Sequence, residues 1–197
     1  MTDPVEAPAE AGRFRIAPWL AVAGVALAAA FALAAMGQPV WCVCGKPFLW
    51  SGNVWSQHNS QHLADPYSFS HVLHGFLFFW LFTRLLPRAA TAWRLACAVA
   101  LEAGWELLEN SPLVINRYRE ATAAVGYQGD TIVNSMSDIL CCALGFAVAR
   151  ALGWRRTLAL FVLIELGMLA FVRDNLTLNV LMLLCPIPGL KAWQMGG

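Results

Sequence analysis

Five hydrophobic segments separated by polar connections dominate the chain. They cover about residues 18–36, 70–86, 93–109, 131–152 and 157–173. A helix that crosses the hydrocarbon of a bilayer needs about 20 mostly apolar residues, and a shorter helix is accommodated when the bilayer thins or the helix ends snorkel. The pattern therefore predicts five transmembrane helices.

A sixth apolar run, Leu176 to Cys185, is too short for a comfortable crossing and is stopped by Pro186 and Pro188. Such pieces occur as half-buried segments beside complete helices. The predicted fold class is therefore all-α: an integral membrane helical bundle with five transmembrane helices plus a short re-entrant or half-spanning C-terminal segment. Whether that segment crosses the membrane stays open.

The polar segments give the remaining domain boundaries. Residues 1–12 are rich in Pro, Ala and Glu and predict a disordered cytoplasmic tail, whereas residues 13–197 form a single transmembrane helical domain. Residues 37–69 and 110–130 are the predicted periplasmic loops. The first apolar segment exceeds the roughly 7–15 apolar residues of a cleaved signal, which favours an uncleaved helix, with a signal as the alternative.

Composition supports a membrane protein. Apolar residues make up 59% of the chain and charged residues 13%, whereas a soluble domain has roughly 45–50% apolar and about 25% charged residues. The net charge of +1 argues against nucleic acid as a partner, because phosphate binding needs a concentrated basic surface. Most Lys and Arg residues fall in the tail and the two short turns, which predicts a cytoplasmic N-terminus.

Three of the hydrophobic segments carry polar residues at helical spacing. One helix face carries Glu102, Glu106 and Glu109, a second carries Asp130, Asn134 and Asp138, and a third carries His71 and His74. With a rise of about 1.5 Å per residue, His74 lies about 6 Å and Glu102 about 10 Å below the outer ends of their helices. The sequence therefore predicts one polar cavity near the outer leaflet.

Two interpretations of these buried ionisable groups carry equal weight. In the first, the acids are partly protonated and hold helices together, with Arg117, Arg119 and Arg173 as partners. In the second, they line a functional cavity open to the periplasm, because ionisable residues inside a membrane are costly and usually have a role.

Histidine spacing adds a candidate metal site. All four histidines lie between His58 and His74, and pairs three or four residues apart can present two imidazoles to one metal if the backbone is helical. A divalent metal is the one candidate cofactor, with these ligands: His62, His71, His74 and Glu106. The alternative is that the histidines hydrogen-bond the acids or lie on the surface. The six cysteines show no repeated metal pattern, and a Cys42–Cys44 disulfide would be strained.

Several longer motifs resemble one known family. They are Ser70–Phe76, Glu102–Glu106, Asn116–Thr122, Asn134–Asp138 and Arg173–Asn179. In this order they look like uncharacterised protein family 0314, also called domain of unknown function 2585, over about residues 40–194. The resemblance implies a multi-pass protein of the bacterial inner membrane, found in alphaproteobacteria, and no particular reaction. In that family's pattern His62 is more typical than His58, which is why His62 enters the metal set.

Three functional hypotheses follow. The first is an enzyme acting on a lipid or lipid-linked headgroup, with these catalytic candidates: His71, His74, Glu102, Glu106 and Asp138. Its anion-binding candidates are Arg117, Arg119 and Arg173. The alternative is a non-enzymatic membrane assembly or binding protein whose acids and histidines hold helices together. The third is a small transporter. Membrane lipids are the predicted partners, and a protein partner or homo-oligomer stays open.

Overall fold

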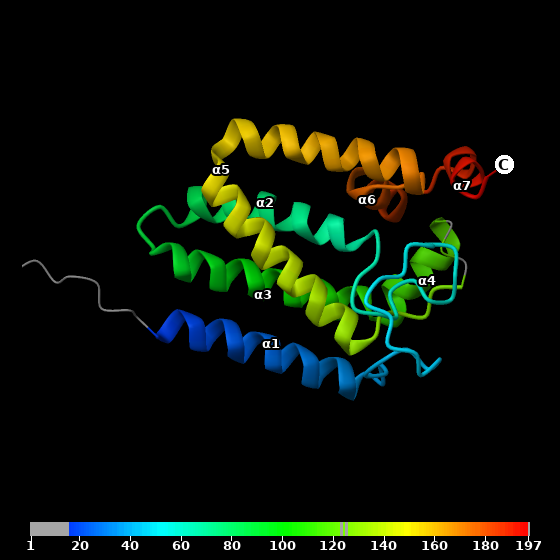
Figure 1. The fold of residues 1–197 in the computed structure, drawn as a ribbon, viewed down its shortest axis with the longest axis horizontal. Coiled ribbons are helices and arrows are strands. Elements are labelled where there is room, and N and C mark those ends of the chain that lie inside the picture. Colours follow the sequence, from blue (N-terminus) through cyan, green and yellow to red (C-terminus); the bar gives the residue numbers. More distant parts are fainter. Residues whose placement is uncertain (1–15, 123, 125, 197) are drawn as a thin grey trace, which may run out of the picture.

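The computed structural model describes residues 16–122, 124 and 126–196, so the predicted tail 1–12 lies outside the described residues. Across the described ranges the chain forms seven α-helices and no strand (Figure 1). They are α1 (Ala17–Ala35), α2 (Ser68–Leu85), α3 (Thr91–Glu109), α4 (Pro112–Ala121), α5 (Ile132–Val172), α6 (Leu176–Leu184) and α7 (Pro188–Gln194). The predicted all-α class is confirmed.

The predicted count of five transmembrane helices is not confirmed. Among the described helices only α1 and α5 are long and apolar enough to cross a membrane, which by length and composition alone weakly suggests a membrane protein. Helix α5 unites the predicted segments 131–152 and 157–173 and folds back at Gly153, whose φ is 72°. Helices α2 and α3 match the predicted segments 70–86 and 93–109, but their histidines and acids make them less apolar.

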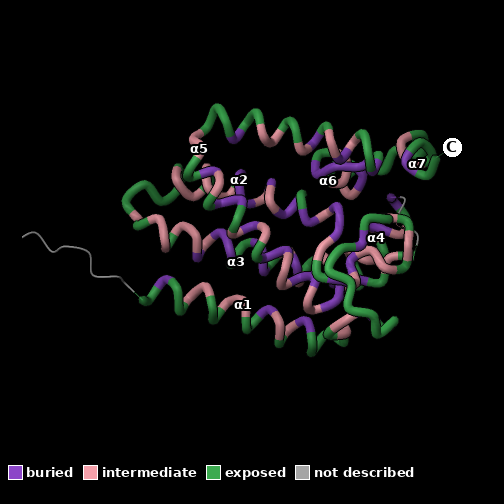
Figure 2. Tube along the Cα trace, in the orientation of Figure 1, coloured by how far each residue is buried: buried purple, intermediate pink, exposed green. Residues whose placement is uncertain are grey.

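The helices lie side by side as one bundle. Helices α1, α2 and α3 run alongside one another, and the second half of α5 turns back to lie along the bundle (Figure 1). The connection between α1 and α2, together with α4, α6 and α7, gathers at one end. Buried residues concentrate where α2, α3 and the first half of α5 meet, and α1 is largely exposed (Figure 2). Several of these buried residues are polar, among them His71, Glu102 and Asp138. They lie beneath the elaborated end of the bundle, which is the end formed by the α1–α2 connection, α4, α6 and α7.

Helices α2 and α5 touch through two glycines. A Cβ placed on Gly75 would meet the backbone of Cys142 and lie 2.6 Å from the backbone nitrogen of Phe146, and a Cβ on Gly145 would meet the backbone of Val72. Small residues let two helix backbones approach closely. This contact fixes the position of His71 and His74 relative to α5.

The predicted loop 110–130 contains a helix that the segment pattern missed. The Ser111 side chain accepts a hydrogen bond from the backbone N–H of Val114, and Pro112 occupies the first turn of α4. Serine at the N-cap followed by proline is a helix-start signal. The hydrophobic pattern did not reveal this helix, because hydrophobic length alone ignores capping.

The C-terminal segment is held by a carboxylate from α5. Glu165 accepts hydrogen bonds from the backbone N–H groups of Leu176, at 2.9 Å, and Thr177, at 3.1 Å. A negative charge at a helix N-terminus is stabilising. The nine residues of α6 span only about 14 Å. Glu165 therefore supports α6.

Candidate functional site

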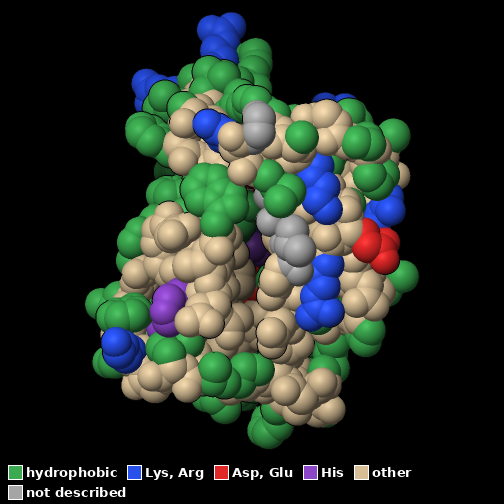
Figure 3. Space-filling model, turned by 90° about the vertical axis from the view of Figure 1, so that its right-hand side faces the viewer, with side chains coloured by type: hydrophobic (Ala, Val, Ile, Leu, Met, Phe, Trp, Pro, Cys, Tyr) green, Lys and Arg blue, Asp and Glu red, His purple; other side chains and the backbone are tan. Residues whose placement is uncertain are grey.

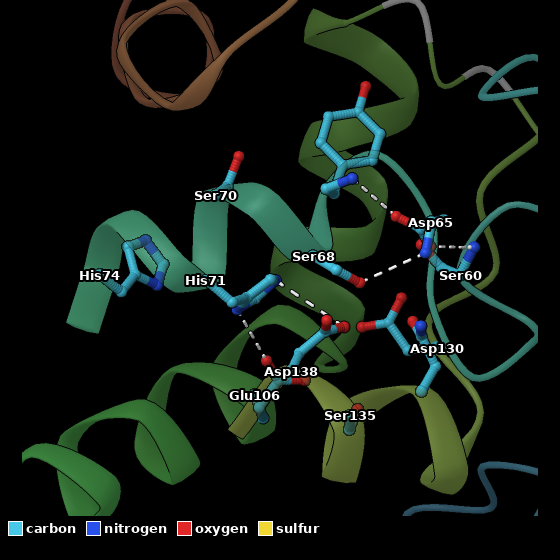
Figure 4. Close-up of polar contacts among 12 residues, drawn as sticks. Ser60, Asp65, Ser68, Ser70, His71, His74, Glu106, Asp130, Ser135 and Asp138 are labelled. Atoms are coloured by element: carbon cyan, nitrogen blue, oxygen red, sulfur yellow. Dashed lines mark hydrogen bonds and ion pairs between the residues drawn. The ribbon is translucent and has the colours of Figure 1, made fainter. Parts of the chain in front are cut away.

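One histidine lies at the meeting point of three helices. His71 of α2 places Nδ1 2.5 Å from Glu102 Oε1 and 3.3 Å from Glu106 Oε1, both on α3. Its Nε2 lies 3.9 Å from Asp138 Oδ2 on α5. All four side chains are buried, and Figure 4 shows His71 directed toward Glu106 and Asp138. The structure thus brings together these groups from three predicted segments.

His74 lies one turn further along α2 and shares Glu102 with His71. Its Nδ1 is 3.0 Å from Glu102 Oε2 and 3.1 Å from Oε1. The ring stacks on Phe78 and meets Trp105 edge-on. Because the carboxylate engages Nδ1, Nε2 is the ring nitrogen left for a ligand. A carboxylate that orients an imidazole is the arrangement of general-base histidines.

The buried carboxylate of Glu106 receives no hydrogen bond from the described residues. Neither of its carboxylate oxygens accepts a hydrogen bond within the described part of the chain, and the same holds for Asp138 Oδ1. A buried carboxylate without a donor is costly unless it carries a proton or meets a cation. The groups His71–His74–Glu102 and His71–Glu106–Asp138 each offer three ligand atoms within 4.8 Å of one another. These residues could therefore hold a divalent metal.

A cavity of about 840 Å³ connects this cluster to the surface. His71, His74, Glu109 and Asp138 are among its lining residues. One end is polar and formed by the loop before α2, by α4 and by the chain before α5. The apolar lining continues along α2 and α3 and includes Leu77, Phe78 and Leu101, together with Phe161 of α5 and Val180 of α6. Figure 3 looks onto the elaborated end, where the surface is hollowed and Lys and Arg side chains lie along one side of the hollow.

The polar end contains residues that the hydrophobic pattern did not single out. All three tyrosines of the chain, Tyr67, Tyr118 and Tyr127, line the cavity. Tyr127 donates a hydrogen bond to Asp130 at 2.8 Å, and the Asn110 amide donates to the same carboxylate at 3.2 Å. A usable signal existed, because tyrosine is rare in this aromatic-rich chain and all three lie in or beside the predicted loops.

Burial changes the protonation of the acids at this end. Burial raises the pKa of Asp130 to about 6, and the nearby charge of Asp65 acts in the same direction. Burial also raises the pKa of Asp65. A carboxyl with a raised pKa favours folding while it is protonated and loses that contribution as the pH rises through the folded-state value. The net charge of the polar end of the cavity, which is its mouth, therefore becomes more negative between about pH 5 and 7 as Asp130 ionises.

The three arginines predicted to bind anions are not among the residues that line the cavity. Arg117 donates to the carbonyl of Leu183 at 2.7 Å, Arg119 to that of Tyr127 at 2.5 Å, and Arg173 to that of Trp193 at 3.1 Å. Among the described residues that line the cavity, none is Lys or Arg. These hydrogen bonds hold α4 and the C-terminal helices in place.

His62 is also separated from the predicted metal set. It lies in the loop between α1 and α2, where its Nε2 is 3.3 Å from His58 Nδ1. None of the metal-type groups of the described chain combines His62 with His71, His74 or Glu106. The physical reason is that α2 begins only at Ser68, so no continuous helix carries the spacing from His62 to His71.

The fold and the cavity define a helical protein with two helices long and apolar enough to cross a membrane and a histidine–carboxylate cluster inside the bundle. Comparison with known protein sequences assigns the chain to a family. The chain belongs to the family described as "Protein of unknown function (DUF2585)", whose model matches residues 33–196.

Three relatives illustrate the match, and each is called a UPF0314 protein. The relative from Sphingopyxis alaskensis is 48% identical over 179 residues, which is 91% of this chain and 95% of the relative. The one from Brucella anthropi is 49% identical over 160 residues, 81% of each chain. The one from Novosphingobium aromaticivorans is 46% identical, covering 90% of this chain and 92% of the relative. No solved structure matches the chain.

Proposed function

We propose that this is a multi-pass protein of the bacterial inner membrane that acts on a lipid or lipid-linked headgroup. The observation that carries the proposal is a cavity whose lining combines histidines and acids with a large apolar part. An amphiphile has the same two-part character. A polar headgroup would lie against His74, and an acyl chain would extend along the apolar lining.

Access from the membrane supports this ligand class. Leu77, Leu101 and Leu108 line the cavity, yet their exposed fractions are 47%, 43% and 46%. Exposed apolar residues at a cavity rim mark a binding groove or a membrane contact. They lie on α2 and α3, so the cavity opens between these two helices toward the side of the bundle. A lipid could enter there without leaving the bilayer.

The direction of insertion follows from the cationic residues. One end of the bundle carries the short connection between α2 and α3 and the fold-back at Gly153. Six arginines belong to the residues at that end: Arg84, Arg88, Arg94, Arg150, Arg155 and Arg156. Short cytoplasmic connections are enriched in Lys and Arg. We therefore place this end and the N-terminus in the cytoplasm and the mouth of the cavity in the periplasm.

The chemistry proposed is general acid–base catalysis by His74. Its Nε2 accepts the proton of a headgroup hydroxyl or of a water molecule, and Glu102 stabilises the imidazolium that forms. Glu102 contacts both rings and so connects His74 to His71. The proton passes along this route to Glu106 or Asp138, which lie against His71, and returns the same way. The cavity offers many acids and no lysine or arginine among its described lining residues. It therefore suits a headgroup that presents an amine or hydroxyl to the cluster.

A second candidate is a non-enzymatic assembly protein in which the cluster only holds helices together. The observation that favours it is the tight pairing of His71 with Glu102, at 2.5 Å, together with the structural use of Glu165 and the three arginines. In that case the cavity would take no substrate, and changes at His74 would alter stability alone.

The deciding experiment replaces His74 by Gln in a bacterial host that lacks its own copy of the gene. We expect His74→Gln to reproduce the lipid profile of the deletion strain, because loss of a general base slows a reaction by about 10²–10⁴-fold. The measurement is mass spectrometry of total lipids, with protein abundance followed in parallel. The matched control is Glu120→Gln, which neutralises an exposed acid outside the cavity lining.

The outcomes separate the two candidates. If His74→Gln restores the lipid profile as fully as the wild-type gene, His74 is not the base. If the deletion strain itself shows no lipid change, the lipid-headgroup proposal is wrong and the assembly role is favoured.

A further inference from the structure

A second cluster of metal-type side chains lies outside the cavity, in the loop between α1 and α2. It consists of Cys42, Cys44, His58 and His62. Each offers one ligand atom, and the four atoms all lie within 4.8 Å of one another. All four cysteine and histidine side chains come from 21 consecutive residues that pass no helix, so the loop itself brings them together.

Two of the three ligand-atom distances match a tetrahedral zinc site. His58 Nδ1 lies 3.3 Å from His62 Nε2 and 3.7 Å from Cys42 Sγ. A zinc ion with Zn–N of about 2.0–2.1 Å and Zn–S of about 2.3 Å separates its nitrogens by about 3.3 Å and a nitrogen from a sulfur by about 3.6 Å. The two sulfurs are 2.8 Å apart and would need to open by about 1 Å. Cys42 and Cys44 are free thiols.

Two of the four side chains are buried and Cys44 is exposed, so the site lies at the surface with one enclosed side. His62 and Cys42 are 1% and 5% exposed, and Phe48 meets both histidine rings edge-on. Backbone N–H groups point at both sulfurs, from Cys44 to Cys42 Sγ at 3.4 Å and from Lys46 to Cys44 Sγ at 3.5 Å. Such donors stabilise thiolates. The chain turns between them at Gly45, whose φ of +70° suits glycine.

We propose that Cys42, Cys44, His58 and His62 bind one zinc ion in a closed structural site. Two thiolates and two imidazoles in tetrahedral array are the ligand set of structural zinc, and soft sulfur ligands disfavour magnesium and calcium. The site does not depend on the lipid proposal, because none of its four ligands lines the cavity.

The position of the site indicates its role. The two residues after His58 line the cavity mouth. The Ser60 carbonyl accepts a hydrogen bond from the Thr131 N–H at 3.0 Å, and Gln61 Nε2 donates to the Gly129 carbonyl at 2.9 Å. Zinc would fix His58 and His62, which flank residues 59–61. It would thereby hold these residues against the start of α5 and stabilise the shape of the cavity mouth.

The test is the metal content of the full-length protein purified in mild detergent without chelator. We expect about one zinc per chain by plasma mass spectrometry, and a loss of at least tenfold in Cys44→Ser and in His62→Ala. Cys185→Ser is the matched control, since Cys185 is another free cysteine and should leave the zinc content unchanged. Zinc retained in Cys44→Ser but lost in Glu106→Gln would overturn the proposal and move the metal to the cavity.

A measurement on the wild-type protein guards against variants that fail to fold. Cobalt added to protein stripped of zinc should give the visible bands of tetrahedral Co²⁺ and a thiolate-to-cobalt charge-transfer band. Absence of both bands, or recovery of Cys42 and Cys44 as a disulfide in metal-free native protein, would contradict the zinc site.

Discussion

Alanine in place of Gly75 is expected to destabilise the protein by about 3 kcal/mol or more, which is at or beyond the upper end of overpacking costs. The added Cβ would collide with the backbone of α5, including the nitrogen of Phe146 at 2.6 Å. A flexible side chain could move aside, but two helix backbones can only separate. Thermal unfolding in detergent, followed by the fluorescence of the nine tryptophans, should show a midpoint about 6–12 °C lower.

The matched control is Gly167→Ala, the same substitution within α5. Nothing lies within 4 Å of a Cβ at that position. Because glycine inside a helix costs about 0.5–1 kcal/mol relative to alanine, this variant should be equally or more stable. A Gly75→Ala protein as stable as Gly167→Ala would show that α2 and α5 do not pack through these backbones.

Phenylalanine in place of His71 is expected to cost about 3–5 kcal/mol, because removing one partner of a buried ion pair leaves the other uncompensated. His71 is in contact with Glu102, Glu106 and Asp138, and all three acids are buried. Phenylalanine fills similar volume, so the loss reports the imidazole and not a cavity. The midpoint of thermal unfolding is again the measurement.

Neutralising the partner supplies the control. The double variant His71→Phe with Glu102→Gln should recover part of the lost stability, whereas Glu120→Gln in the same background should recover none. If His71→Phe unfolds at the wild-type temperature, the cluster does not depend on the histidine. A double variant no more stable than His71→Phe would show that Glu102 is not its charged partner.

Helix positions could be predicted from the sequence because apolar runs are long and local. The observed bounds of α1, α2 and α3 lie within two residues of the predicted segments. The break near Gly153 was also visible, although the helix continues directly on both sides of it. Helix α4 was missed because its start depends on the cap at Ser111, and the approach at Gly75 and Gly145 depends on pairing between helices, which hydrophobicity does not encode.

The site was predictable in part for the same reason. Helical spacing placed His71 and His74 on α2 and the two glutamates on α3, and a shared depth brought them together. The loop residues carry no such period, so His62 was assigned to the wrong neighbours and its proximity to Cys42 was not foreseen. The hydrogen bonds from the three arginines to backbone carbonyls were not foreseen, because a sequence does not show which carbonyls lie within their reach.

The central claim is that the acid–histidine cavity receives a lipid headgroup, and photolabelling in membranes tests it most directly. The probe is a phosphatidylethanolamine analogue with a diazirine beside its amine, with adducts mapped by mass spectrometry. We predict adducts on residues 67–78 at the start of α2, on residues 101–109 of α3 and on Tyr118, Thr122 and Tyr127 around α4, and their loss when unlabelled lipid is added. Adducts found only along the outer faces of α1 and the second half of α5 would contradict the account.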